Sequence, residues 1–437
     1  MTSALPSTPR FGVNYVPRSG WFHSWLSPRW DEIRRDLDTI AGLGLDHVRI
    51  FPFWPILQPN RTLIREEALA DVRTMAQLAG ESGLEVAVDV VQGHMSSFDF
   101  VPAWLTSWHR RNMFSDPDVV AAQVDLTAAL HSTLEDLPQY IALTLGNEVN
   151  QFSGDPHPTP MRATADEAEG WIRALLGALP EDRKVLGLHA EYDAVWYLDD
   201  HPFLPEHAAA LGDVTAIHSW IFNGTAQRYG GMSPQSVRHG EYLMEVARAF
   251  APEQDKPVWL QEIGAPLSQL AAEEAPEFCT RSVQHAADSD ALWGVTWWCS
   301  HDVDRSLADF PDLEYSLGLI DAEGEVKSIG RAFQAAAAEI RSRPTGPPPR
   351  REAVIVEVDE RNVPVRRGDL APGGAVFEAW MDAAIAGRRP GVITSRMARD
   401  AGSLAARGVQ VAQPVVSTGQ SVYSAVSDSE ALGEGAR

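Results

Sequence analysis

Two glutamates end apolar, strand-like runs in this sequence, and their positions indicate the chemistry of the chain. Glu148 ends the run ALTLGNE at 142–148, and Glu262 ends the run PVWLQE at 257–262. In a parallel barrel the C-terminal ends of the strands, with the loops after them, build the active site. Two carboxyl groups brought together there are what cleavage of a glycosidic bond requires. The sequence therefore predicts paired-carboxylate chemistry on a sugar.

The elements that must position these glutamates follow a repeated strand–helix pattern. Short β-branched or aromatic runs alternate with amphipathic helical segments. Strands are predicted at 11–15, 46–51, 84–90, 140–146, 184–188, 213–217, 256–261 and 293–298, and helices at 29–42, 66–82, 117–135, 164–179, 203–210, 234–250, 270–287 and 328–341. This alternation predicts an α/β fold, a (β/α)8 TIM barrel over 11–341. No Gly-x-Gly-x-x-Gly motif follows the first strand, which disfavours a dinucleotide-binding fold.

A smaller unit is predicted after the barrel. A Pro-rich linker spans 342–352, and a strand, a helix and a second strand then predict a small α/β accessory unit over 353–416. A unit of this size is marginal by itself, so we expect it to pack on the barrel or on a neighbouring subunit of a homo-oligomer. The segment 417–437 is predicted to be a disordered tail.

Composition narrows the classes of partner. The formal net charge of −24 argues against nucleic acid and an anionic membrane, and no run approaches a membrane span. The 14 tryptophans favour carbohydrate, because indole rings stack on sugars, although they also fill cores. Cys279 and Cys299 lack metal-ligand spacing and fit a reducing compartment. We expect no metal and no cofactor.

These residues together resemble the clan of retaining (β/α)8 glycosidases, and within it glycoside hydrolase family 5, which contains cellulases and mannanases. The resemblance covers roughly 11–341 and rests on the Asn147-Glu148 pair, on Glu262 and on Arg49 in the run HVRI. It implies that Glu148 is the acid/base and Glu262 the nucleophile. It also implies that Arg49 supports the nucleophile.

The resemblance further implies contacts from His94, His218 and Trp298, which follow or end the third, sixth and eighth strands. Trp297 competes with Trp298 for the inward position. The family's His-x-Tyr appears here as His218-Ser219-Trp220. Because indole donates a hydrogen bond but cannot accept one, either another group takes the role of the tyrosine or the nucleophile is tuned differently.

Charge logic assigns the protonation states. Retention requires one protonated and one ionised carboxyl group about 5–5.5 Å apart. We expect Arg49 to keep Glu262 ionised, and ionised Glu262 to raise the pKa of Glu148. Asn147 is predicted to hold the sugar 2-hydroxyl.

Simpler structural roles remain open for each of these residues. Either glutamate alone is also compatible with a helix cap, Arg49 with a structural ion pair, and the histidines and Trp298 with packing roles. Glu191, after the fifth strand, and Asp302, after the eighth, are candidate substrate contacts, with solvated loop charge as the alternative.

The expected substrate is a small oligosaccharide. Residues 1–10 do not look like a signal peptide, which predicts a cytoplasmic enzyme that acts on an imported sugar. The run WWCSHD at 297–302 and the C-terminal unit resemble intracellular exo-β-mannosidases that process Manβ1,4GlcNAc from N-glycan cores. The alternatives are an intracellular β-glucosidase, an endo-β-mannanase or cellulase, and, from another class, a non-catalytic sugar-binding barrel.

Overall fold

A computed structural model of the chain describes residues 5–417, so the predicted tail lies outside the described residues except for Ser417. Its main sheet contains eight parallel strands in the order β7-β6-β3-β2-β1-β10-β9-β8. Contacts between β7 and β8 close this sheet into a barrel. The strands are β1 (Arg10–Asn14), β2 (His47–Ile50), β3 (Glu85–Val91), β6 (Tyr140–Asn147), β7 (Leu186–Ala190), β8 (Thr215–Ser219), β9 (Val258–Ile263) and β10 (Leu292–Trp297).

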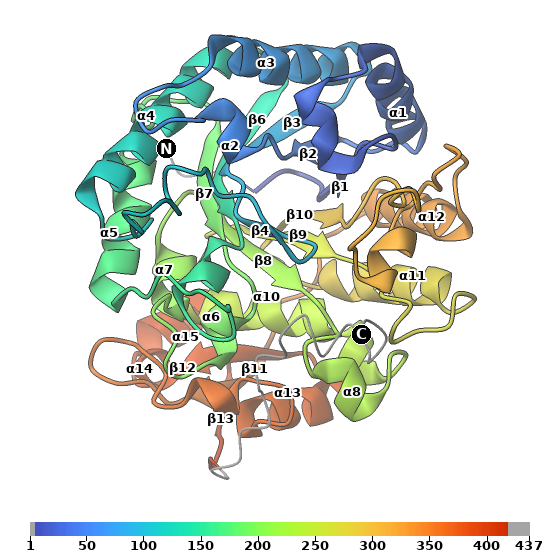
Figure 1. Cartoon of the computed structure of the whole chain (residues 1–437). Coiled ribbons are helices and arrows are strands. Elements are labelled where there is room, and N and C mark those ends of the chain that lie inside the picture. The colour runs from blue at the N-terminus through green and yellow to red at the C-terminus, as the bar shows by residue number, and fades with distance from the viewer. Residues whose placement is uncertain (1–4, 418–437) are drawn as a thin grey trace.

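Helices ring the strands in Figure 1, which confirms the predicted (β/α)8 barrel. The principal ones are α1 (Trp30–Gly42), α3 (Glu66–Glu81), α4 (Pro117–Leu134), α5 (Ala165–Leu176), α7 (Pro205–Ala210), α10 (His239–Phe250), α11 (Ala275–Ala286) and α12 (Ser328–Arg341). Local sequence explains where several of them begin. The side chain of Asp116 accepts hydrogen bonds at the start of α4, and Thr164 with Glu167 forms a capping box on α5.

Large side chains fill the barrel interior below the strand ends. The Thr296 hydroxyl lies 2.8 Å from His47 Nε2 and accepts a hydrogen bond of 2.7 Å from Trp259 Nε1. Gly12 makes room for His47, because a Cβ at that position would lie 2.3 Å from the imidazole ring. These packed side chains support the polar side chains at the C-terminal ends of the strands.

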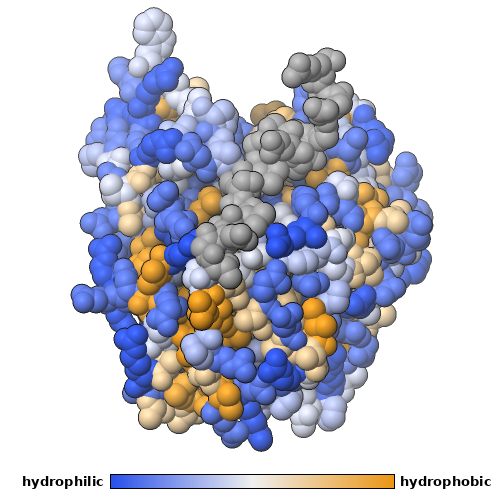
Figure 2. Space-filling model, turned by 90° about the horizontal axis from the view of Figure 1, so that it is seen from below, coloured by the Kyte–Doolittle hydropathy of each residue, from blue (hydrophilic) through white to orange (hydrophobic). Residues whose placement is uncertain are grey.

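The C-terminal segment forms a three-stranded parallel sheet in the order β12-β11-β13, with three helices. The bounds are β11 (Glu352–Val356), α13 (Ala375–Ile385), β12 (Pro390–Thr394), α14 (Ser395–Ala398), α15 (Ala401–Arg407) and β13 (Val411–Pro414). It packs against α10 at the lower edge of Figure 1. Seen from that side, the surface mixes hydrophobic and hydrophilic side chains (Figure 2). Its exposed apolar residues include Val365, Ile385 and Val411.

Among the described residues, no helix combines the length and the apolar character needed to cross a membrane.

Candidate active site

Glu148 follows directly on β6 and begins a short 3-10 helix, η2 (Val149–Ser153). Its backbone is left-handed, with φ 45°, a conformation that is uncommon for a residue with a Cβ and is often found at functional sites. The Glu148 amide donates to the carbonyl of Ala190 at 3.1 Å. The side-chain oxygen Oε2 accepts a hydrogen bond of 2.7 Å from Gln151 Nε2.

Glu262 lies near the end of β9, beside His218 of the neighbouring strand β8. The imidazole joins the two carboxylates, because His218 Nδ1 lies 2.7 Å from Glu148 Oε1 and 3.4 Å from Glu262 Oε2. One ligand atom from each of the three side chains lies within 4.8 Å of the other two. Oxygens this close correspond to the short carboxyl separation of retaining glycosidases, since inverting enzymes place the groups about 6.5–9.5 Å apart.

Arg49 of β2 organises the floor beneath the carboxylates. It is fully buried and donates from Nη1 to Glu262 Oε1 at 2.9 Å. Its Nε and Nη2 bind the two oxygens of Asp89, on β3, at 2.8 and 2.6 Å. Nη2 also donates to Asn147 Oδ1 at 2.9 Å, while Asn147 Nδ2 donates to the carbonyl of His94 at 3.0 Å. One guanidinium therefore orients both the carboxylate of Glu262 and the amide beside Glu148.

Burial has a larger effect on Glu262 than Arg49 does, contrary to the sequence-based expectation. Burial raises the pKa of Glu262, His218 and Arg49 lower it, Glu148 raises it, and the net direction is upward. For His218, burial alone would lower the pKa, but Glu262 and Glu148 together raise it above its ordinary value. The three groups are thus arranged to exchange protons with one another.

Trp220 stands where the family has a tyrosine, and its indole Nε1 donates to Glu262 Oε2 at 3.3 Å. Gly264 allows this approach, because a Cβ there would lie 2.7 Å from the Trp220 ring and 2.9 Å from the carbonyl of Trp298. Trp298 packs edge-on against Phe51, whereas Trp297 packs on Phe333 of helix α12. Trp298 is therefore the member of the tryptophan pair on the site side.

His94 begins a small hairpin of β4 (His94–Met95) and β5 (Phe98–Asp99). Its backbone carbonyl touches Asn147, but its Nδ1 lies 3.0 Å from Asp99 Oδ1. Hydrogen bonds from His157 and His94 lower the pKa of Asp99 against the opposing effect of burial. The His94 side chain thus helps to fold the loop over the site.

Two predicted contacts lie outside the carboxylate group. Glu191 forms a close contact with Nδ1 of His189, and both side chains are buried. Asp302 accepts from Lys327 Nζ at 2.8 and 3.0 Å and from the amide of Gly318 at 2.8 Å. These partners tie Glu191 to the barrel wall and Asp302 to the segment that leads into α12.

Aromatic loops after four strands meet beside the site. Trp21, in the loop after β1, lies 5.5 Å from Phe98 and 4.7 Å from Phe310, measured between ring centroids. Phe53 stacks on Phe100 at 3.9 Å. Trp104 instead contacts Trp54. Loops from β1, β2, β3 and β10 therefore form one aromatic wall.

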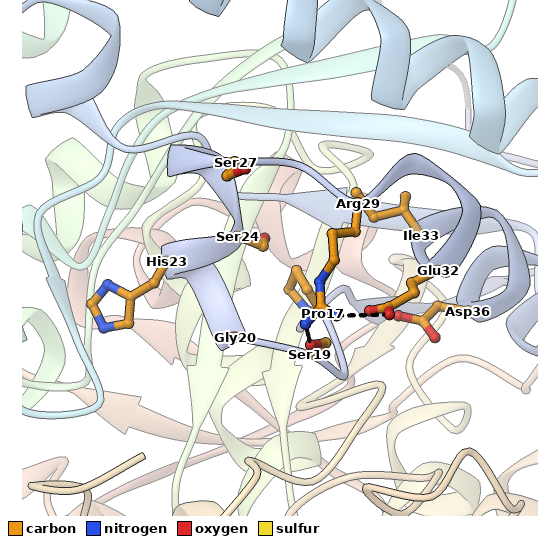
Figure 3. Close-up of a pocket in the computed structure, with 10 residues that line it drawn as sticks. All are labelled: Pro17, Ser19, Gly20, His23, Ser24, Ser27, Arg29, Glu32, Ile33 and Asp36. Carbon is orange, nitrogen blue, oxygen red and sulfur yellow. Dashed lines mark hydrogen bonds and ion pairs between the residues drawn. The ribbon is translucent and has the colours of Figure 1, made fainter. Parts of the chain in front are cut away.

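A hollow of about 190 Å³ lies between the loop after β1 and the start of α1 (Figure 3). Arg29 points to Glu32 at 2.9 Å and also contacts Ser19. Asp36 accepts a hydrogen bond of 3.1 Å from Tyr15. None of the residues that line this hollow is a predicted site residue, and its charges are paired locally.

Sequence reasoning missed five polar residues that contact the predicted group directly or through one another: Asn14, Asp89, Thr144, Gln151 and Gln261. The detectable signal was a single polar residue inside an otherwise apolar strand, as at Asp89 in EVAVDVV. Such residues are rarely fully buried without a partner.

Comparison with known proteins gives close structural matches. The chain is 51% identical to a GH5_18 structure from Bifidobacterium longum subsp. infantis, over 94% of this chain and 98% of that one, with a TM-score of 0.92. It is 52% identical to a glutamate-to-alanine variant of GH5_18 from Streptomyces cattleya in complex with Manβ1,4GlcNAc, over 93% and 99%, with a TM-score of 0.92.

A more distant match shows the fold alone. The exo-β-1,4-mannosidase Op5Man5 from Opitutaceae bacterium strain TAV5 is 24% identical over 89% of this chain and 70% of that one, with a TM-score of 0.73. No family model and no curated protein matches the chain. The identity and coverage of the close matches decide the family: this chain belongs to the GH5_18 group of glycoside hydrolase family 5 and is a β-glycosidase.

Proposed function

We propose that the protein is a retaining exo-β-mannosidase that releases mannose from Manβ1,4GlcNAc and other short β-mannosides. Glu262 is the nucleophile and Glu148 the acid/base. The observation that carries this proposal is the Glu148–His218–Glu262 group, whose ligand atoms lie within 4.8 Å of one another. That separation leaves the nucleophile within reach of the anomeric carbon while the acid faces the leaving oxygen.

In the first step a Glu262 oxygen attacks the anomeric carbon, the glycosidic C–O bond breaks, and Glu148 gives its proton to the leaving oxygen. Arg49 and Trp220 hold the two Glu262 oxygens by N–H donors at 2.9 and 3.3 Å, so the carboxylate is oriented before substrate arrives. In the second step Glu148 takes a proton from water, whose oxygen displaces Glu262 and frees the sugar.

Asn147 is proposed to bind the sugar 2-hydroxyl. Its amide nitrogen carries two hydrogens, of which one serves the His94 carbonyl, so the second can donate to the sugar. Arg49 fixes the amide by donating to Oδ1. A site built around one hydroxyl orientation rejects the other, because its polar groups are then left unpaired. We therefore propose that Asn147 selects the axial hydroxyl of mannose over the hydroxyl of a gluco-configured sugar.

The substrate assignment draws on the relatives. GH5_18 structures from Streptomyces cattleya and Bifidobacterium longum are described in complex with Manβ1,4GlcNAc. The aromatic wall around Trp21 supports exo action, since loops packed in this way limit the space beyond the cleaved sugar. His218, Trp220 and Trp298 are proposed to line the mannose site. His94 is proposed to shape it through its loop, and Glu191 and Asp302 to support its walls.

The test is hydrolysis of Manβ1,4GlcNAc, of short β-mannosides and of matched β-glucosides, with product stereochemistry followed by NMR. We expect mannose as the first product, formed with retention, and little activity on polymeric mannan or cellulose. A fall in mannan viscosity before any monosaccharide appears would instead favour the endo-β-mannanase. Higher activity on glucosides would favour a β-glucosidase. Binding without turnover would favour a non-catalytic barrel.

We also propose a cytoplasmic enzyme of N-glycan sugar degradation that assembles through its C-terminal segment. The two cysteines are free and buried, which fits a reducing compartment. The exposed apolar residues of the C-terminal segment support a contact between copies. Cell fractionation tests the location. Light scattering of the purified protein tests the assembly, and a monomer at all concentrations would contradict it.

A further inference from the structure

A chain of buried polar groups runs beneath the two carboxylates. His218 Nε2 lies 3.3 Å from Gln261 Oε1, and Gln261 Nε2 lies 3.2 Å from the Thr144 hydroxyl. Thr144 of β6 pairs in register with Asp89 of β3, and its hydroxyl lowers the pKa of that carboxyl through a side-chain hydrogen bond. We propose that Gln261 and Thr144 are positioning residues that fix the tautomer of His218 and thereby keep the acid proton in the Glu148–His218 contact. This inference rests on the proposed role of Glu148.

The direction of the hydrogen bonds follows from the Asp89 end. Both oxygens of Asp89 accept N–H groups from Arg49, at 2.8 and 2.6 Å, which is the bidentate geometry of an ionised carboxylate. Burial outweighs Arg49 and raises the pKa of Asp89, but the permanently charged guanidinium bound to both oxygens favours the ionised carboxylate at neutral pH. An ionised carboxylate only accepts, so the Thr144 hydroxyl must donate to it.

The hydrogen positions on Gln261 and His218 follow from this donation by Thr144. With its proton used toward Asp89, the Thr144 oxygen accepts the N–H of Gln261. The Gln261 carbonyl oxygen therefore faces His218, and Nε2 of His218 must carry a hydrogen. Thr144 and Gln261 are fully buried, so water does not compete for these bonds.

This tautomer decides what Glu148 faces. Neutral His218 with a hydrogen on Nε2 presents the lone pair of Nδ1 to Glu148 Oε1 at 2.7 Å. Oε2 of Glu148 already accepts from Gln151, so the proton of the pair lies between Oε1 and Nδ1. Losing that proton would leave a carboxylate facing a lone pair, which is unfavourable. The arrangement therefore holds the shared proton between Glu148 and His218, whose pKa is raised.

Charged groups on or directly after four other strands face His218. Glu148 follows β6 and Glu262 lies on β9, while Arg49 and Asp89 lie on β2 and β3. Glu262 and Glu148 favour a proton on the imidazole, and Arg49 disfavours it. Both carboxylates lie on the Nδ1 side and favour a hydrogen there. The contacts that favour a hydrogen on Nε2 come from Gln261 and Thr144.

The test compares Thr144→Val with Thr144→Ser. Valine has nearly the same shape as threonine but removes the hydroxyl, which frees Gln261 to turn and His218 to place its hydrogen on Nδ1. That hydrogen would stabilise ionised Glu148, so the basic limb of the kcat/KM profile on Manβ1,4GlcNAc should move to lower pH by about one unit. Serine keeps the hydroxyl and should restore the limb.

The leaving group separates positioning from general damage. Dinitrophenyl β-mannoside needs little acid assistance, so Thr144→Val should retain its kcat/KM on this substrate, whereas it should lose about tenfold or more on Manβ1,4GlcNAc above neutral pH. Thr127→Val is the matched control, because Thr127 is also fully buried and its hydroxyl donates to the carbonyl of Gln123 one turn earlier in α4. Its profile should match the wild type.

Nitrogen-15 NMR spectra of protein labelled at histidine report the tautomer of His218 without turnover. The spectrum of His218→Gln identifies which signals belong to His218. Hydrogen on Nε2 of neutral His218 supports the inference, and hydrogen on Nδ1 overturns it. An unchanged basic limb in Thr144→Val, or equal losses on both substrates, also overturns it. If the wild type cleaves no β-mannoside, only the proposed function fails. The resting spectrum still reports the tautomer of His218, and it does so whether or not Thr144→Val folds.

Discussion

Two buried clusters of arginine and carboxylate differ in how many arginines surround the central carboxylate. In the barrel mouth, the single guanidinium of Arg49 serves the two carboxylates of Asp89 and Glu262. Between α10 and the C-terminal segment, the carboxylate of Glu245 lies 3.2, 3.2 and 3.6 Å from Arg350, Arg248 and Arg407. Arg350 also pairs with Glu241, and Arg248 with Asp290. Both clusters consist of the same two kinds of group.

Their electrostatic outcomes are opposite. Burial raises the pKa of Glu262 and one shared arginine does not reverse this, so the group stays ready to exchange protons. At Glu245 burial also raises the pKa, but three arginines outweigh it and lower the value to about 2. A carboxylate held so firmly in its charged form is suited to structure, whereas one that is under-compensated is suited to chemistry.

The second cluster also explains why the C-terminal segment is not a loose appendage. Arg350 lies just before β11 and Arg407 ends α15, so Glu245 of α10 gathers both ends of the segment onto the barrel. Tyr242 of the same helix donates to the carbonyl of Leu370 at 2.7 Å. The segment completes the outer layer of the barrel at α10.

The largest expected effect comes from Glu262→Ala, which removes the nucleophile from the first cluster. Turnover of Manβ1,4GlcNAc should fall by about 10⁴-fold or more. Added azide should give an α-glycosyl azide, because a small anion can occupy the vacated position. Product NMR makes the measurement. Near-wild-type activity would remove Glu262 from this role.

Glu148→Ala should be next in size. Without a proton donor, kcat/KM on the natural glycoside should fall by about 10²–10⁴-fold. A dinitrophenyl mannoside should still react and trap the glycosyl-enzyme, from which azide forms a β-product. Intact-protein mass spectrometry detects the trapped species. Equal losses on both substrates would contradict the acid role.

Glu245→Ala tests the second cluster and should change stability rather than activity. Three arginines would lose a partner that they share, although Arg350 retains Glu241 and Arg248 retains Asp290, and breaking a buried ion pair costs about 3–5 kcal/mol. Urea unfolding measures the loss, while kcat/KM of the folded protein should be preserved. Glu169→Ala is the control, because it removes an exposed pair with Arg173 and should change stability little. A stability of Glu245→Ala equal to that of this control would refute the distinction between the clusters.

The two clusters should also differ in the pH range over which they lose their effects, activity for the first cluster and stability for the second. Activity should be bell-shaped, and its acid limb should lie above the ordinary glutamate value because the pKa of Glu262 is raised. The pKa of Glu245 is lowered from 4.5 to about 2, so the stability it contributes is complete above 4.5 and is lost as pH falls toward 2. Activity should therefore disappear while circular dichroism still reports a folded chain. Coincident losses would count against the comparison.

The smallest expected effect is that of chelator. Glu148, His218 and Glu262 could together ligate a metal ion, but the proposed mechanism needs protons on this group and no cation. Activity should be unchanged after dialysis against EDTA. A loss that a divalent ion restores would assign the first cluster to metal chemistry instead.

Local patterns in the sequence determined the barrel and the positions of its carboxylates. Apolar runs and amphipathic segments are properties of neighbouring residues, so each strand could be predicted within a few positions. A glutamate at the end of such a run must reach the C-terminal rim once the strands are parallel. The third strand of the C-terminal sheet, β13, was missed, since it is short and ends at Pro414.

Only the tertiary structure decided which polar groups meet. Register shifts lie between Thr144 and Asn147 on β6 and between Ile217 and His218 on β8, and each shift changes which side chains point inward at the strand end. The chain from His218 through Gln261 and Thr144 to Asp89 spans four strands that are distant in sequence. The same holds for Trp220 on Glu262 and for the separate partners of Glu191 and Asp302. Such contacts depend on register and closure, which no single strand encodes.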